Sequence, residues 1–200
     1  MTRNRDEDKA RLIIDRVLLD DNVKKYMCME KDYSQHLFQH SCNVAFIATQ
    51  ICLNLNYSMA IIEDIVAGAL LHDIGKIKIP FPIIEKIGNL TDKEYEIVKT
   101  HPAYGYEIIK NTGFSEIVND IVLHHHENEI GCGYPDASTD MDLETKIVAI
   151  ADKYDAITSS RPYHPVPPSF YKSFVTIQSF SNQYSFTEPI FTAMYRCKGL

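Results

Sequence analysis

The stretch ALLHDIGKIKIP, residues 69–80, decides how this sequence is interpreted. An apolar run ends on a histidine and an aspartate, and a glycine, a lysine and a proline follow, which predicts a helix that gives way to a loop. His72 lies seven residues after Ile65, and Asp73 lies four residues after Ala69, so both continue the core-facing side of that helix. Because an ionised group buried without a partner is costly, this pair requires an explanation.

Apolar residues recur at helical spacing along most of the chain, and no convincing alternating strand is visible. We therefore predict an all-α fold, and 200 residues with 45% hydrophobic composition suit one domain spanning 1–200. The predicted helices cover about 35–55, 58–72, 91–101, 102–111, 115–122 and 142–159, with a capping box at Thr91 and Glu94.

The two ends of the chain differ from this pattern. Residues 1–27 are a charged helical lead-in, and residues 164–200 form a divergent, proline-containing C-terminal segment. The expected apolar side of the lead-in consists of Leu12, Ile13, Ile14, Val17, Leu18 and Leu19.

Composition limits the class of protein. A formal net charge of −7 and a pI near 5.6 argue against a long nucleic acid or an anionic membrane as partner. Five scattered cysteines without a CxxC pair indicate reduced thiols. The charged start lacks an apolar signal segment, and no run of apolar residues is long enough to span a membrane. We expect a cytoplasmic protein.

The placement of His72 and Asp73 recurs elsewhere in the sequence. Apolar stripes of other predicted helices also continue into a polar residue, namely His40, His101, His125 and Asp152. Any one of them alone is more often a hydrogen-bonded core residue, but the recurrence favours shared cations. Imidazole and carboxylate together suit zinc, iron or manganese. The donors exceed the needs of one ion, so a bridged pair is expected, a common device for phosphoester hydrolysis.

These motifs match those of a known family. HDIGK, with His40 upstream and IADKYDA (150–156) downstream, resembles the HD superfamily of metal-dependent phosphohydrolases. The stretches KTHPAYGYEII (99–109), HHENEIGCGYP (125–135) and TSSRPY (158–163) are similar to the HD-GYP branch, whose better-known members hydrolyse cyclic di-GMP. The resemblance covers about residues 36–163 and implies a helical bundle around a buried multinuclear metal site.

The resemblance also assigns roles to residues. It implies two divalent ions, iron or manganese first and zinc, nickel, cobalt or magnesium as alternatives, with Asp73 bridging them. The implied ligands are His40, His72, Asp73, His101, His125, His126 and Asp152, which leaves His124 outside the set. A third ion is expected only if His36 replaces the glutamate that some members carry there. Asp73 and Lys76 are the implied catalytic residues, and Lys76, Arg161 and Tyr134 the implied substrate-binding residues.

Three hypotheses for the function follow. The first is a phosphodiesterase that cleaves a cyclic dinucleotide such as cyclic di-GMP. The second keeps the chemistry but changes the substrate to another nucleotide or small phosphoester, because Ile130 and His164 depart from the family's pattern. The third is a nucleotide-binding signalling module without turnover. Asp155 is interpreted as a structural residue that caps or pairs locally, and the oligomeric state is left open.

Overall fold

A computed structural model of the chain describes residues 5–159 and Ile190. Within these residues the fold contains helices and no strand, which confirms the predicted all-α class. The elements are α1 (Arg5–Val17), α2 (Asp21–Tyr33), α3 (Gln35–Asn54), α4 (Met59–Leu71), the 3₁₀ helix η1 (Ile74–Lys78), α5 (Phe81–Ile84), α6 (Asp92–Val98), α7 (His101–Ile109), α8 (Glu116–His124) and α9 (Leu143–Thr158). In the part of the chain so described, no helix is both long and apolar enough to cross a membrane.

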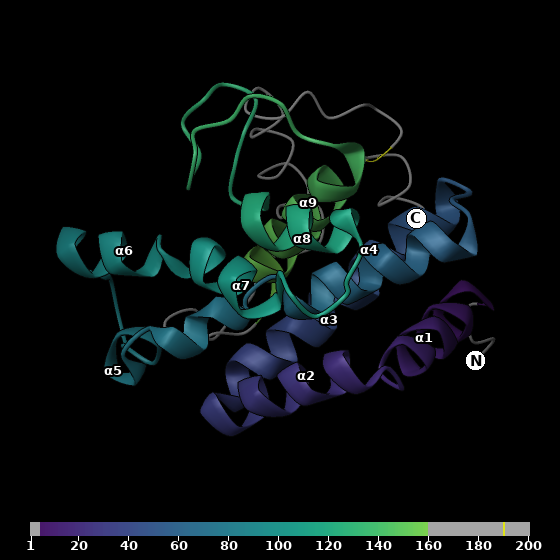
Figure 1. Ribbon diagram of the computed structural model, residues 1–200, viewed down its shortest axis with the longest axis horizontal. Helices are drawn as coiled ribbons and strands as arrows, with labels where there is room; N and C mark the ends of the chain where they lie inside the picture. Colours follow the sequence, from purple (N-terminus) through teal and green to yellow (C-terminus); the bar gives the residue numbers. More distant parts are fainter. Residues whose placement is uncertain (1–4, 160–189, 191–200) are drawn as a thin grey trace.

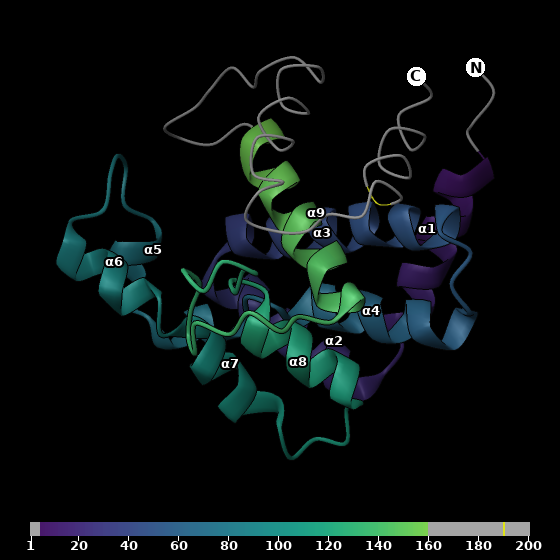
Figure 2. The same ribbon diagram turned by 90° about the horizontal axis from the view of Figure 1, so that it is seen from above.

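The core lies between α3, α4, α8 and α9. Helix α3 packs against α4 and α9, and α4 packs against α8, so that Figures 1 and 2 show these helices gathered at the centre of the molecule. The contacts are made by fully buried branched side chains, among them Ile51, Ile65, Ile121 and Ile147. In both views α5 and α6 stand out from one end of this bundle.

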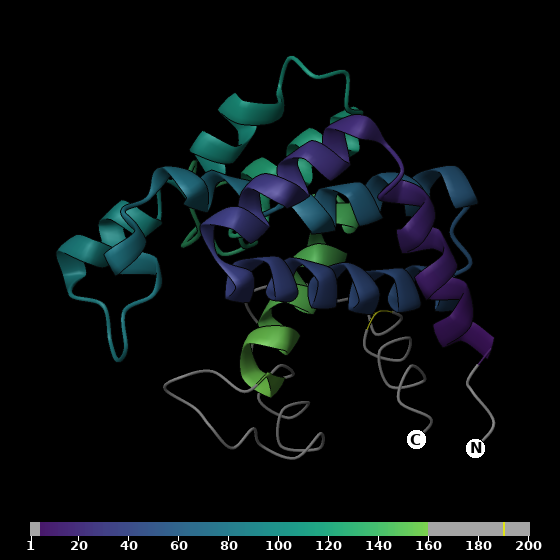
Figure 3. The ribbon, with the colours of Figure 1, turned by 90° about the horizontal axis from the view of Figure 1, so that it is seen from below.

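The N-terminal region is helical, as predicted, but it is two helices rather than one lead-in. Asp20 ends the first and caps α2, since its carboxylate accepts hydrogen bonds from the first backbone amides of that helix. Ile13 and Ile14 are buried, whereas Leu12 and Leu19 are 70% and 79% exposed, so the predicted apolar side was too wide. Figure 3 shows α1 and α2, in purple, on the outer side of the bundle.

The short elements before α7 set the geometry of the later site. The predicted capping box at Thr91 and Glu94 is present at the start of α6. The segment after Asp73, expected as a loop, is a 3₁₀ turn followed by one turn of α5. At Gly75 a Cβ would lie 1.9 Å from the carbonyl oxygen of His101 and 2.5 Å from the backbone nitrogen of Gly105. Only glycine allows η1 and α7 to approach this closely, and the approach places Asp73 beside His101.

We expect Gly75→Ala to lower the free energy of unfolding by about 3 kcal/mol, because η1 and α7 must separate to admit a methyl group. Gly113→Ala is the matched control: a Cβ there meets nothing within 4 Å, and its φ of +82° adds only backbone strain of about 1 kcal/mol. Urea denaturation of the two variants measures the difference. Equal losses in both would show that the close approach is not a constraint.

Candidate metal centre

Side chains far apart in the sequence meet at the end of the bundle where several helices begin or end. His40 comes from α3, His72 and Asp73 follow α4, His101 begins α7, and His125 and His126 follow α8. Their donor atoms form two groups, each with all its atoms within 4.8 Å of one another: Asp73, His101, His125 and His126, and His40, His72 and Asp73. Asp73 belongs to both groups.

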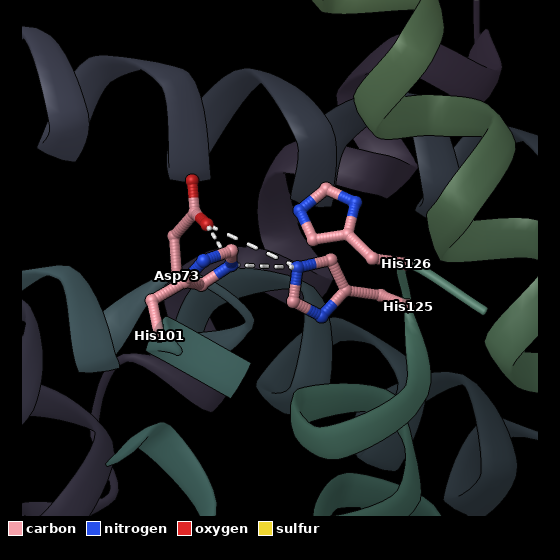
Figure 4. A group of neighbouring side chains, drawn as sticks. All are labelled: Asp73, His101, His125 and His126. Carbon is pink, nitrogen blue, oxygen red and sulfur yellow. Dashed lines mark hydrogen bonds and ion pairs between the residues drawn. The ribbon is translucent and has the colours of Figure 1, made fainter. Parts of the chain in front are cut away.

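The two oxygens of Asp73 serve different histidines. Its Oδ1 lies 3.1 Å from Nε2 of His101 and 3.9 Å from Nε2 of His125. Its Oδ2 lies 3.4 Å from Nε2 of His72 and 3.6 Å from Nε2 of His40. Figure 4 shows the rings of His101 and His125 turned toward the carboxylate, with His126 beside them. Asp73 therefore sits between two sets of imidazoles, with one oxygen toward each.

Three of these rings are oriented by the same local device. Nδ1 of His72, His101 and His125 donates to a backbone carbonyl three or four residues earlier, at 2.8, 2.7 and 3.1 Å respectively. These carbonyls belong to the last turns of α4, α6 and α8, where carbonyls commonly lack partners within the helix. The carbonyl of Ile121 also accepts from the backbone nitrogen of His125, but Nδ1 of His125 lies 3.2 Å from the carbonyl of Val122 as well, to which no described backbone amide donates. Because a carbonyl only accepts, Nδ1 carries a proton in each ring, and in His101 and His125, whose pKa values burial lowers, the lone pair of Nε2 faces the centre.

His40 lies within α3 and uses a different partner. Its Nδ1 donates to Oδ2 of Asp155 on α9 at 2.6 Å, and the other oxygen of Asp155 accepts from Asn43 and Ser159 at 2.9 and 2.6 Å. Nε2 of His40 lies 3.0 Å from Oδ1 of Asp152. Asp155 thus bonds locally to Ser159 and also reaches a histidine on another helix. Burial lowers the pKa of His40, but the two aspartates outweigh burial and raise it to about 9.

His101, His125, His126 and Asp73 are buried in the protonation states that cation binding requires. Burial lowers the pKa of His101 and, more strongly, the pKa values of His125 and His126, so these rings are neutral at neutral pH. Burial would raise the pKa of Asp73, but the charge of Lys76 and the neighbouring histidines hold it well below its usual range. Nζ of Lys76 donates to Oδ2 of Asp73 at 2.5 Å.

The donor atoms fit a divalent cation. Nε2 of His72 and Oδ1 of Asp73 are buried and make no hydrogen bond to any described residue. Nε2 of His101 and Nε2 of His125 lie 3.3 Å apart, and both carry lone pairs because their protons are on Nδ1. Such an arrangement is unfavourable unless a positive charge lies between them. Nitrogen and carboxylate donors in this mixture suit iron, manganese or zinc rather than calcium.

A cavity of about 340 Å³ opens beside the cluster. One wall carries donor atoms and charge, from Lys76, His40, His101, His126 and Asp152. The remaining lining residues come largely from α5, the loop after it and the end of α6. The ring of Tyr134 lines the cavity and lies 4.7 Å from the ring of His126, centre to centre.

The other residues singled out from the sequence lie outside the two donor groups or outside the described residues. His36 is exposed at the cavity and belongs to neither donor group, so its role at a third ion stays a prediction. His124 lies apart from the cluster, with its ring 3.5 Å from Asp136. Arg161 and His164 lie outside the described residues, as does the segment 164–200 except for Ile190.

Sequence reasoning missed Glu127, which closes the loop after the histidine pair. This residue is fully buried, and its Oε1 accepts from the backbone nitrogen of Asp136 at 2.6 Å. A Cβ at Gly133 would lie 2.4 Å from Cα of Glu127, so the loop folds tightly around it. Ile130, the departure from the family's pattern, is 52% exposed and takes no part in this closure. Glu127 lies within the motif HHENEIGCGYP (125–135), but no role was assigned to it from the sequence.

Glu30 on α2 was also missed. It is fully buried, and neither of its oxygens makes a hydrogen bond to a described residue. Burial raises its pKa to about 8, so it is largely protonated at neutral pH. Its position within a charged stretch gave no sign of burial.

Comparison with known proteins now identifies the family. A sequence profile described as the HD domain matches residues 27–182. The chain belongs to the HD domain family. A cyclic di-GMP phosphodiesterase of Pseudomonas aeruginosa is 37% identical over 136 residues, which cover 66% of this chain and 33% of the relative. A cyclic di-GMP phosphodiesterase of Thermotoga maritima is 35% identical over 157 residues, 76% of this chain and 42% of the relative. The chain therefore spans less than half the length of these curated relatives.

Solved structures of HD proteins share the fold. An HDG"Y"P protein from Bdellovibrio bacteriovorus superimposes with a TM-score of 0.68 at 18% identity, over 97% of this chain and 62% of that one. The HD domain of the phosphodiesterase PgpH of Listeria monocytogenes, solved in complex with cyclic di-AMP, gives a TM-score of 0.66 at 19% identity, over 85% and 91%. The predicted HD-domain helical bundle is confirmed.

We expect Asp155→Asn to weaken metal binding about 10- to 100-fold, because an amide no longer fixes and polarises the ring of His40. Elemental analysis after dialysis against graded metal concentrations measures the loss, and the visible absorption of the cobalt-substituted protein reports the changed ligand field. Asp120→Asn is the control, since Asp120 lies near His124 and away from the cluster. Unchanged affinity and spectrum in Asp155→Asn would refute this role.

Proposed function

We propose that this chain is a metal-dependent phosphodiesterase that hydrolyses a cyclic dinucleotide such as cyclic di-GMP. The observation that carries the proposal is the position of Asp73, whose two oxygens face two separate sets of imidazoles at the edge of a cavity. The family and the names of the curated relatives support this activity. The motifs that include Tyr134 favour the HD-GYP branch.

The proposed centre holds two divalent ions, iron or manganese before zinc, nickel, cobalt or magnesium. One set of ligands is Asp73, His101, His125 and His126, and the other is Asp73, His40, His72 and Asp152. Such ions supply the positive charge that neutralises a phosphodiester and acidifies a water molecule. Asp73 would be shared by both ions, and the approach of each of its oxygens to a different set of histidines supports this proposal.

Three further residues, Lys76, Tyr134 and Arg161, are proposed to act on the substrate. Lys76 lies at the cavity and is held by Asp73, so its ammonium is positioned to stabilise negative charge that develops on the phosphate. Tyr134, stacked against His126, limits where the substrate can lie. Arg161 is proposed to bind a phosphate oxygen pair, from outside the described residues. A third ion at His36 and a cytoplasmic location remain part of the proposal.

A second candidate function is the hydrolysis of a smaller phosphoester. The cavity of about 340 Å³ lies near the lower end of the range for small-molecule sites, roughly 300–1,000 Å³. This volume favours a mononucleotide over a larger ligand that must be enclosed entirely. A panel of cyclic, linear and monoester nucleotides, assayed anaerobically with ferrous iron and with manganese, separates the two candidates.

Asp73→Ala should remove bound metal and lower the rate of cyclic di-GMP hydrolysis by about 10³-fold or more, because both donor groups lose their shared carboxylate. Product chromatography and elemental analysis on the same sample measure the two effects, and circular dichroism checks the fold. His124→Ala is the matched control, since this neighbour of the histidine pair lies outside the cluster. Wild-type rate and metal content in Asp73→Ala would exclude the proposed centre, and tight nucleotide binding without turnover in the metal-loaded wild type would favour a binding module.

A further inference from the structure

The part of the cavity lining that comes from α5 and the loop after it differs in composition from the metal centre. It contains the half-buried apolar side chains Ile83, Ile84 and Leu90, and between them two adjacent charged residues, Glu85 and Lys86. An apolar surface with few fixed polar groups is typical of a site that orients a planar organic ligand.

Glu85 is held by a buried residue of another element. Oγ of Ser34 donates to Oε1 of Glu85 at 2.5 Å, and Ser34 is itself buried at the start of α3, where it also accepts from the backbone nitrogen of Leu37. Ser34 is therefore fixed by the helix that it caps, and it fixes the Glu85 carboxylate in turn. Among the described residues, Oε2 of Glu85 has no hydrogen-bond donor, and Glu85 lines both this cavity and a second, shallower pocket beside Ser34, so the carboxylate keeps a free acceptor where the two meet.

Lys86 is likewise held by a side chain of another element. Its Nζ donates to Oε2 of Glu94 at 2.5 Å, and Glu94 belongs to the capping box at the start of α6. An ammonium group has three protons, so the ion pair leaves two for another acceptor. A strong acceptor and a strong donor, adjacent in the sequence, thus line the same cavity as Lys76 and the residues of the metal centre.

We propose that Glu85 and Lys86 recognise a guanine base of the substrate and determine base specificity, an inference that rests on the proposed function. The carboxylate of Glu85 accepts from the N1–H and the N2 amino group of guanine, and Lys86 donates to O6. Adenine presents an acceptor at N1 and no amino group at C2, so it cannot satisfy this pair. The side chains of Ile83, Ile84 and Leu90 cover the apolar faces of the base.

The test compares cyclic di-GMP with cyclic di-IMP, which lacks only the N2 amino groups, and with cyclic di-AMP. The metal-loaded wild type should have a kcat/KM for cyclic di-GMP about tenfold or more above that for the other two. Glu85→Gln should lose most of the preference for cyclic di-GMP over cyclic di-IMP, because an amide cannot accept both N–H groups. Glu107→Gln is the matched control, since Glu107 forms an exposed ion pair with Lys110 on α7 away from the cavity.

Ratios of kcat/KM separate recognition from structural damage. A displaced α5 would lower the rates for all three substrates together and leave their ratios unchanged. An unchanged ratio of cyclic di-GMP to cyclic di-IMP in Glu85→Gln, or no preference in the wild type, overturns the inference and leaves the proposed function standing.

If the metal-loaded wild type hydrolyses no cyclic dinucleotide, the proposed function fails separately. Calorimetric titration with GMP and IMP then decides the base site. A preference for GMP that Glu85→Gln removes supports it, and equal affinities in the wild type overturn it.

Discussion

One buried carboxylate surrounded by inward-facing imidazole nitrogens is the constraint on which this structure depends. Asp73 faces His101 and His125 with one oxygen and His72 and His40 with the other, and among the described residues Lys76 is the one lysine or arginine in contact with it. Without further cations the facing lone pairs repel one another, and the loss of water around them is uncompensated. The bundle must therefore be held together by its apolar core strongly enough to keep these groups in place, which the fully buried contacts of α3, α4, α8 and α9 provide.

Helix ends explain how a sequence with simple apolar stripes builds such a centre. An imidazole placed just past the last turn of a helix satisfies a carbonyl that the helix leaves unpaired, and this bond fixes the ring tautomer. His72 and His125 follow their helices in this way, through the carbonyls of Ala69 and Val122, so the spacing that predicted them reflects a real mechanism. His101 was predicted from the same spacing, yet Ile97 is 41% exposed and α6 ends at Val98. His101 is buried because it begins α7, which the stripe did not reveal.

The residues that the sequence concealed are those whose partners lie in distant elements. Asp155 bonds His40 across 115 positions of the chain, and only the packing of α3 against α9 brings them together. Glu127 and Glu30 are buried, although a carboxylate in a charged stretch is usually solvated. Local signals were more reliable, since the predicted capping box at Thr91 and Glu94 is present, and Ser58 and Ser115 cap α4 and α8 near the predicted starts of those helices. Periodicity predicts which face is buried, but the partner of each buried charge depends on tertiary packing.

In the proposed function, the reaction and the recognition of the base use two parts of the cavity lining, and different contacts hold these two parts in place. The donor groups are attached to long helices that share the core, so a substitution there disturbs the whole bundle. The other part of the lining is one turn of α5 and a loop, which two side-chain bonds, Ser34 to Glu85 and Lys86 to Glu94, hold to the ends of α3 and α6. Because these bonds lie outside the core, the polar groups of this part can change with little cost to the metal centre. A fold arranged in this way keeps its reaction while the base that it accepts is set by a few residues of one short segment.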